Sequence, residues 1–173
     1  MASYYYLISS LPMLRTQGEP PMDYAAFLAM CRSAVSAGVY RTLEELTVDS
    51  DKGPLLSEWA GFYKALCREL TYQRNVKLGR PCAVPSDRDA GIVQTVTAAV
   101  NAENPLEGEW LLLDLEFRRL DGMIGLHNFD DHALYGYAMK LQLLERQRTF
   151  RYESGKRAFD GLMQSIRQQV SSL

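Results

Sequence analysis

Apolar residues recur at intervals of three and four along most of the chain, a spacing typical of amphipathic α-helices. Helix-capping residues, prolines and glycines mark where each pattern starts and stops. No alternation with a period of two follows the first ten residues. The pattern predicts six helices: from Asp23 to before Gly38, from Pro54 to Val76 or Leu78, after Asp87 to Val100, from Asn104 to Ile124, after Asp130 or Asp131 to Leu144, and after a break at residues 152–155 to Val170.

The pattern that begins at Asn104 is the strongest of the six. Its apolar residues follow a four-three rhythm, so we expect all of them to face a core, and their burial to contribute roughly 10 kcal/mol before entropy is subtracted. Additional leucines widen this face, which predicts a central helix with neighbours on more than one side. Asp114 and Arg118 are spaced to pair on its exposed face. The rhythm comprises Leu106, Trp110, Leu113, Phe117, Leu120 and Ile124.

Two short segments lie before the second long helix. Residues 4–11 are aromatic and aliphatic, and they fit either a short strand or a helical turn before Pro12. Residues 43–46 fit one helical turn. A chain of 173 residues is long enough to bury one sizeable core. The expected fold is therefore all-α, a single-domain bundle of about six helices that spans residues 1–173.

Composition indicates an ordinary globular protein. Hydrophobic residues make up 47% and charged residues 23% of the chain, and the net charge is −2. Such a charge gives no general attraction to nucleic acid or to anionic lipid. The first residues lack a basic stretch and meet Ser9, Ser10 and Pro12 early, so we expect no signal peptide. No apolar run approaches a membrane span. These features predict a cytoplasmic protein that reaches membranes only through partners.

The three cysteines are far apart in the sequence and form no C-x-x-C pair, which argues against a disulfide framework or a structural zinc site. Cys31 and Cys67 lie among apolar residues, and we expect both to be buried free thiols. Cys82 lies in a proline-bounded loop and is expected to be exposed and inert.

Recognisable catalytic motifs are lacking: there is no G-x-S-x-G and no glycine-rich phosphate loop. We therefore expect no catalytic residue, cofactor or metal. One polar cluster, at residues 127–132, contains two imidazoles and two carboxylates and could bind a metal in principle. Its spacing matches no recurrent helical metal pair, so an aspartate N-cap with solvent-facing histidines is the plainer interpretation. The alternative is a small metal-dependent enzyme built on His127, Asp130, Asp131 and His132.

Charge is distributed unevenly. Residues 140–157 contain six basic and two acidic side chains, whereas residues 106–122 contain five acidic and two basic ones. Adjacent helices with complementary or solvated faces explain this pattern most simply. A basic docking surface for a protein partner is the second interpretation. Nucleic acid is a poor candidate because no aromatic residues alternate with the bases.

Several segments together resemble a small uncharacterised bacterial family that is encoded beside the genes of V-type ATPases. They are residues 4–12 (YYYLISSLP), Arg74-Asn75 with Leu78-Gly79, residues 104–109 (NPLEGE), residues 137–146 (YAMKLQLLER) and residues 153–156 (ESGK). Members of that family look like a reduced version of the connector subunit, designated C or d, of V/A-type ATP synthases. Known connector subunits are longer and consist of repeated helical lobes, and this chain has no internal repeat.

The resemblance implies a non-catalytic connector that joins the central shaft to the membrane rotor ring on the cytoplasmic side, peripheral to the inner membrane. The run from Tyr137 through Lys140 to Glu145 is similar to a helix near the end of the connector subunit. The basic residues that follow this run are further candidates for docking, because of the position of their positive charge. A helical assembly chaperone or adaptor is the alternative function. The predicted partner-binding residues are Tyr137, Lys140, Glu145, Arg146, Arg148 and Arg151.

Overall fold

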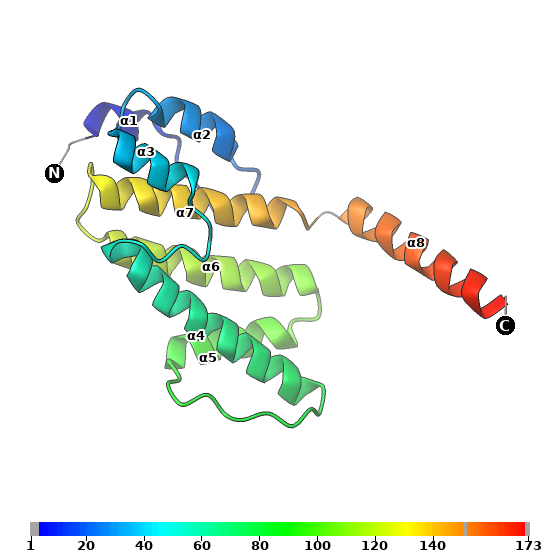
Figure 1. The fold of residues 1–173 in the computed structure, drawn as a ribbon. Helices are drawn as coiled ribbons and strands as arrows, with labels where there is room; N and C mark the ends of the chain where they lie inside the picture. The colour runs from blue at the N-terminus through cyan, green and yellow to red at the C-terminus, as the bar shows by residue number, and fades with distance from the viewer. Residues whose placement is uncertain (1–3, 151, 172–173) are drawn as a thin grey trace.

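The computed structural model describes residues 4–150 and 152–171, and the part of the chain that it describes contains eight α-helices and no strand (Figure 1). The predicted all-α bundle is confirmed, with two helices more than the sequence pattern indicated. The helices are α1 (Tyr5–Ser10), α2 (Tyr24–Cys31), α3 (Ala37–Glu44), α4 (Pro54–Lys77), α5 (Ala90–Asn101), α6 (Pro105–Ile124), α7 (Asp131–Arg148) and α8 (Tyr152–Ser171).

Both additional helices lie in the first quarter of the chain. The segment before Pro12 is the short helix α1, not a strand. The helix expected from Asp23 to Gly38 is interrupted at residues 32–36. Ser36 starts a new helix there, because its Oγ accepts a hydrogen bond from the Val39 N–H at 3.4 Å. Gly38 therefore belongs to the first turn of α3 and does not end α2.

Capping residues fix the starts of α5, α6 and α7. Asn104 Oδ1 accepts the Leu106 N–H at 3.0 Å, and Asp130 caps α7 by accepting from the N–H groups of residues 132 and 133. Asp89, not the expected Asp87, caps α5. Gly79 has a positive φ of 65°, which lets it close α4 at low conformational cost.

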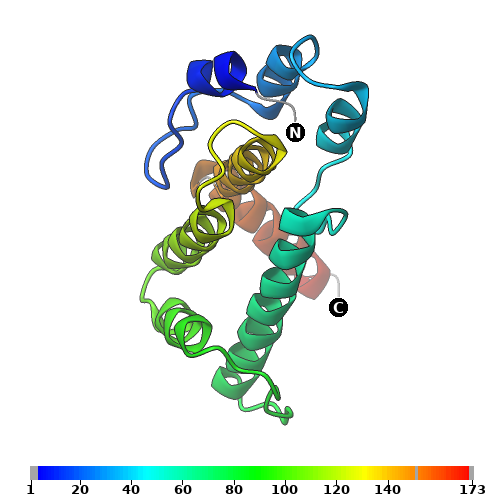
Figure 2. The same ribbon diagram turned by 90° about the vertical axis from the view of Figure 1, so that its left-hand side faces the viewer.

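Helix α7 lies at the centre of the bundle. It packs against α2 and α3 on one side and against α6 and α4 on the other, and α5 completes the far end by packing on α4 and α6 (Figures 1 and 2). Its leucines, together with Trp59 of α4, are fully buried. The Trp59 Nε1–H donates to the Val48 carbonyl at 2.8 Å, so the buried indole leaves no unsatisfied donor.

Two residues expected in the core lie at the surface. Trp110 of α6 is 46% exposed, whereas Leu113, Phe117 and Leu120 of the same rhythm are buried. Helix α8 extends away from the bundle (Figure 1), and Trp110 borders an open hollow together with Leu144 and Phe150. Cys67 is also exposed, because the inner face of α4 runs through Leu66 and places the next residue outside; Cys31 is buried as expected.

Helix α8 extends away from the rest of the bundle (Figure 1). Within the described residues, none of the helices has the length and apolar character needed to cross a membrane.

Candidate functional site

The predicted docking residues Tyr137 and Glu145 hold segments of the bundle together. The Tyr137 hydroxyl donates to the Pro12 carbonyl at 3.0 Å, and the Glu145 carboxylate accepts the Tyr24 N–H at 2.6 Å. Burial raises the pKa of Tyr137 to about 12. Both side chains therefore fasten the N-terminal segments to α7.

Lys140 also has partners inside the molecule. Its ammonium group pairs with Asp121 of α6 and lies 5.3 Å from the centre of the Phe117 ring. The side chain is only 14% exposed. The charge that the sequence suggested for a partner is therefore directed at α6, as the interpretation of complementary helix faces requires.

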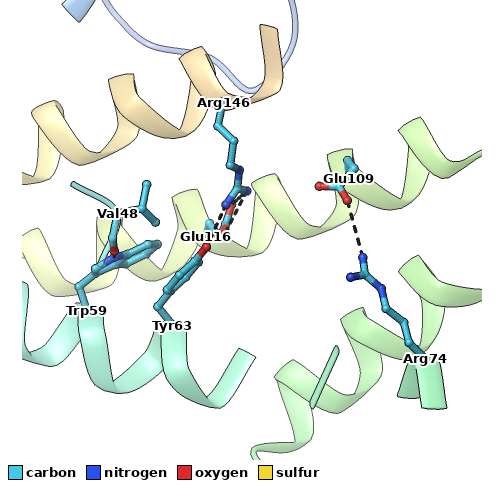
Figure 3. A network of polar contacts seen from close by, with 7 residues as sticks. All are labelled: Val48, Trp59, Tyr63, Arg74, Glu109, Glu116 and Arg146. Carbon is cyan, nitrogen blue, oxygen red and sulfur yellow. Dashed lines mark hydrogen bonds and ion pairs between the residues drawn. The ribbon is translucent and has the colours of Figure 1, made fainter. Parts of the chain in front are cut away.

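Arg146 of α7, which is partly exposed, forms an ion pair with the buried Glu116 of α6. Its Nη2 donates to Glu116 Oε2 at 2.9 Å, and its Nη1 donates to the Tyr63 hydroxyl of α4 at 3.3 Å (Figure 3). Glu116 is almost completely buried. Three helices thus meet at one guanidinium group in the middle of the molecule.

The protonation of Glu116 depends on this environment. Burial disfavours the carboxylate and raises the pKa of Glu116 to about 7, while the nearby positive charge of Arg146 opposes the shift. The ion pair lowers the pKa of Glu116 and burial raises it, and burial has the larger effect. Glu116 therefore titrates near neutral pH.

Arg148 and Arg151 complete the predicted set. Arg148 is exposed and lies beside a hollow that Trp110 and Phe150 also line. Arg151 lies outside the described residues. The docking role of all six residues stays a prediction. Four of them have contacts that stabilise the fold, and Arg148 is the described member of the set that borders an open hollow.

The polar cluster at residues 127–132 forms a helix cap. His127 Nδ1 shares a hydrogen bond with Asp130 Oδ2, and the rings of His127 and His132 stack with centres 4.2 Å apart. The other carboxylate oxygen of Asp130 accepts the N–H groups at the start of α7. Among the residues that the structure describes, no three His, Cys, Asp or Glu side chains are grouped so that they could hold a metal ion.

An apolar surface surrounds the first two turns of α6. Residues of these turns line three hollows in the described part of the molecule, whose volumes are about 350, 290 and 850 Å³. The largest lies between α6 and α8 and is lined by Leu106, Phe150 and Phe159, among others. We call the region of Leu106, Trp110, Phe150 and Phe159 the apolar end of the bundle.

Helix α8 continues this surface away from the bundle. Phe159 is 61% exposed and Leu162 is 59% exposed, and Ile166 is exposed on the same side, one further turn along. Val170, which the sequence places on this stripe, lies outside the described side chains. The stripe has the periodicity of a core-facing helix but packs on little of its own chain.

Sequence reasoning identified the apolar stripe of α8 and assigned Trp110 to the core. The four-three rhythm identifies Trp110 and the stripe of α8 as apolar faces, and it contains no information on what covers them. One further pair was not expected: Arg88 donates to Glu69 at 2.6 and 2.9 Å and holds the loop before α5 against α4.

Comparison of the chain with models of protein families, with curated proteins and with solved structures found no match. The case for a function therefore depends on the surface just described and on the resemblance of the sequence segments.

Proposed function

We propose that this protein is a non-catalytic connector of a V-type ATPase that lies on the cytoplasmic side between the central shaft and the rotor ring. The observation that carries the proposal is α8, a helix of 20 residues that presents an exposed apolar stripe outside the bundle. The resemblance of the sequence segments to a reduced connector subunit supplies the identity of the machine, and α8 supplies the reason to expect a protein partner.

A solvated amphipathic helix gains stability from a partner. A single helix of this length is marginal in water, and most helical stability in proteins comes from packing of the apolar face. At 1.5 Å per residue α8 is about 30 Å long, enough to lie along a partner helix for several turns. The notch between α8 and the apolar end of the bundle adds a second wall, so a partner helix could be held from two sides.

The proposal is tested by purifying the protein from its own cells in mild detergent and identifying the subunits that accompany it. Recovery of rotor-ring and central-shaft subunits in fixed proportion is the expected result. Recovery of the protein alone, or with unrelated proteins, contradicts the connector role. Recovery of motor subunits only before assembly is complete, with the protein missing from the finished motor, indicates the alternative, an assembly chaperone.

Variants locate the interface. Replacing Phe159 and Leu162 by serine should abolish co-purification without changing the helical content of the bundle, because both side chains are exposed. The matched control is Leu126→Ser, which alters another exposed leucine in the loop that follows α6. If the double variant still binds the motor as the control does, α8 is not the docking element. Arg148→Glu tests the predicted basic docking surface in the same assay.

A further inference from the structure

A second hollow opens between α4, α5 and α6 and does not involve α8. Its volume is about 350 Å³. Residues 74–78 at the end of α4 and residues 105–109 at the start of α6 contribute to the same walls, although about 30 positions separate them in the sequence. The walls are mainly apolar and include Leu70, Leu78, Ala99, Val100, Ala102 and Leu112.

Two cations lie on one wall of this cavity. Arg74 and Lys77 are three residues apart on α4, so their side chains are on the same side of the helix. Arg74 is 60% exposed, and its ion pair with Glu109 is long, at 4.0 Å (Figure 3). Lys77 donates a hydrogen bond to the Val100 carbonyl. A guanidinium has five N–H donors and an ammonium has three, so both groups have donors left for an anion.

A carboxylate lies across the cavity from these cations. Glu109 of α6 is among the lining residues and is mostly buried. A ligand that carried only an apolar chain and an anionic head would bring its negative charge close to Glu109 without offering a donor. A ligand with an N–H group beside its anion could accept hydrogen bonds from the two cations and donate one to Glu109.

We propose that this cavity binds the carboxyl-terminal residue of a protein partner. The apolar side chain of that residue fills the cavity, its α-carboxylate accepts hydrogen bonds from Arg74 and Lys77, and its backbone N–H donates to Glu109. A volume of 350 Å³ is at the small end of the range for ligand pockets, and it suits one large side chain with its main chain. The inference rests on the proposed protein-binding role and specifies a second contact besides α8.

The test is an NMR titration of the full-length protein with two synthetic pentapeptides of glycine and serine that end in leucine. One peptide has a free carboxylate and the other a terminal amide. The free acid should cause saturable shifts of the amide signals of residues 99–102 and 108–112, and the terminal amide should bind about tenfold more weakly or not at all. Absence of saturation with the free acid up to several millimolar, or equal affinity for both peptides, overturns the proposal.

Charge variants identify the binding groups. Arg74→Gln with Lys77→Gln should weaken binding of the free acid about tenfold. The matched control, Lys64→Gln with Arg68→Gln, removes the same two charges from exposed positions earlier on α4 and should bind like the wild type. Equal affinity of the two double variants contradicts the assignment. If the wild type binds the peptide but recovers no motor subunits, the connector role is refuted and the cavity proposal stands. If the wild type does not bind the peptide but the Arg74/Lys77 variant still recovers the motor, the cavity proposal is refuted and the connector role stands.

Discussion

Replacing Arg146 by methionine separates its structural contribution from a docking role. In the wild type the guanidinium neutralises a buried carboxylate on α6 and donates to the Tyr63 hydroxyl of α4. Methionine fills similar space but leaves Glu116 in an apolar environment without a positive charge. Removing one partner of a buried ion pair typically costs about 3–5 kcal/mol, and protonation of the remaining acid limits the loss. We expect the free energy of unfolding to fall by about 3 kcal/mol at pH 8.

The loss should depend on pH. Glu116 has a pKa of about 7 in the folded wild type, and removal of Arg146 raises it further. At pH 5 the acid is neutral in the variant, so only the lost hydrogen bonds remain, at about 1–2 kcal/mol. Urea unfolding followed by circular dichroism at pH 5 and pH 8 measures both values.

Two further variants complete the measurement. Replacing the pair by leucine and methionine, Glu116→Leu with Arg146→Met, should return the stability to within about 1 kcal/mol of the wild type, because no charge then remains buried. Arg148→Met, at the last turn of α7, should change stability by less than about 0.5 kcal/mol. A loss below about 1 kcal/mol for Arg146→Met at pH 8, or the same loss at both pH values, would refute the buried-pair argument.

Two other expectations follow from the core. Because burial raises the folded pKa of Glu116 from 4.5 to about 7, its contribution to stability is complete below pH 4.5 and is lost as the pH rises through 7. The loss is about 3 kcal/mol, and Glu116→Gln should remove this part of the pH dependence in unfolding titrations from pH 4 to 8; an unchanged pH profile contradicts the shift. Gly108→Ala should destabilise the protein by about 1–3 kcal/mol, because the new Cβ would lie 2.6 Å from the Ala99 carbonyl oxygen. Gly61 of α4 faces open space, so Gly61→Ala should instead stabilise the protein by about 0.5–1 kcal/mol. Equal stability of the two variants in thermal unfolding would contradict the close approach of α5 and α6 at Gly108.

The sequence by itself determined the helices and most of their ends. A period of three to four residues and a capping side chain act within one or two turns, so Asn104 and Gly79 could be assigned from their neighbours alone, and the start of α7 was narrowed to Asp130 or Asp131. The exceptions were local as well. Ser36 caps α3 inside a segment where the sequence predicted one continuous helix, and the cap of α5 is Asp89, two residues after the expected Asp87.

Tertiary structure decided which residues of other helices each side chain contacts. Lys140 and Arg146 are basic residues on an amphipathic helix, and only the approach of α6 shows that they neutralise Asp121 and Glu116. Trp110 has the spacing of a core residue, yet it is exposed and borders an open hollow. The periodicity of a helix records that a face is apolar, but the residues that cover it come from distant parts of the chain or from another molecule.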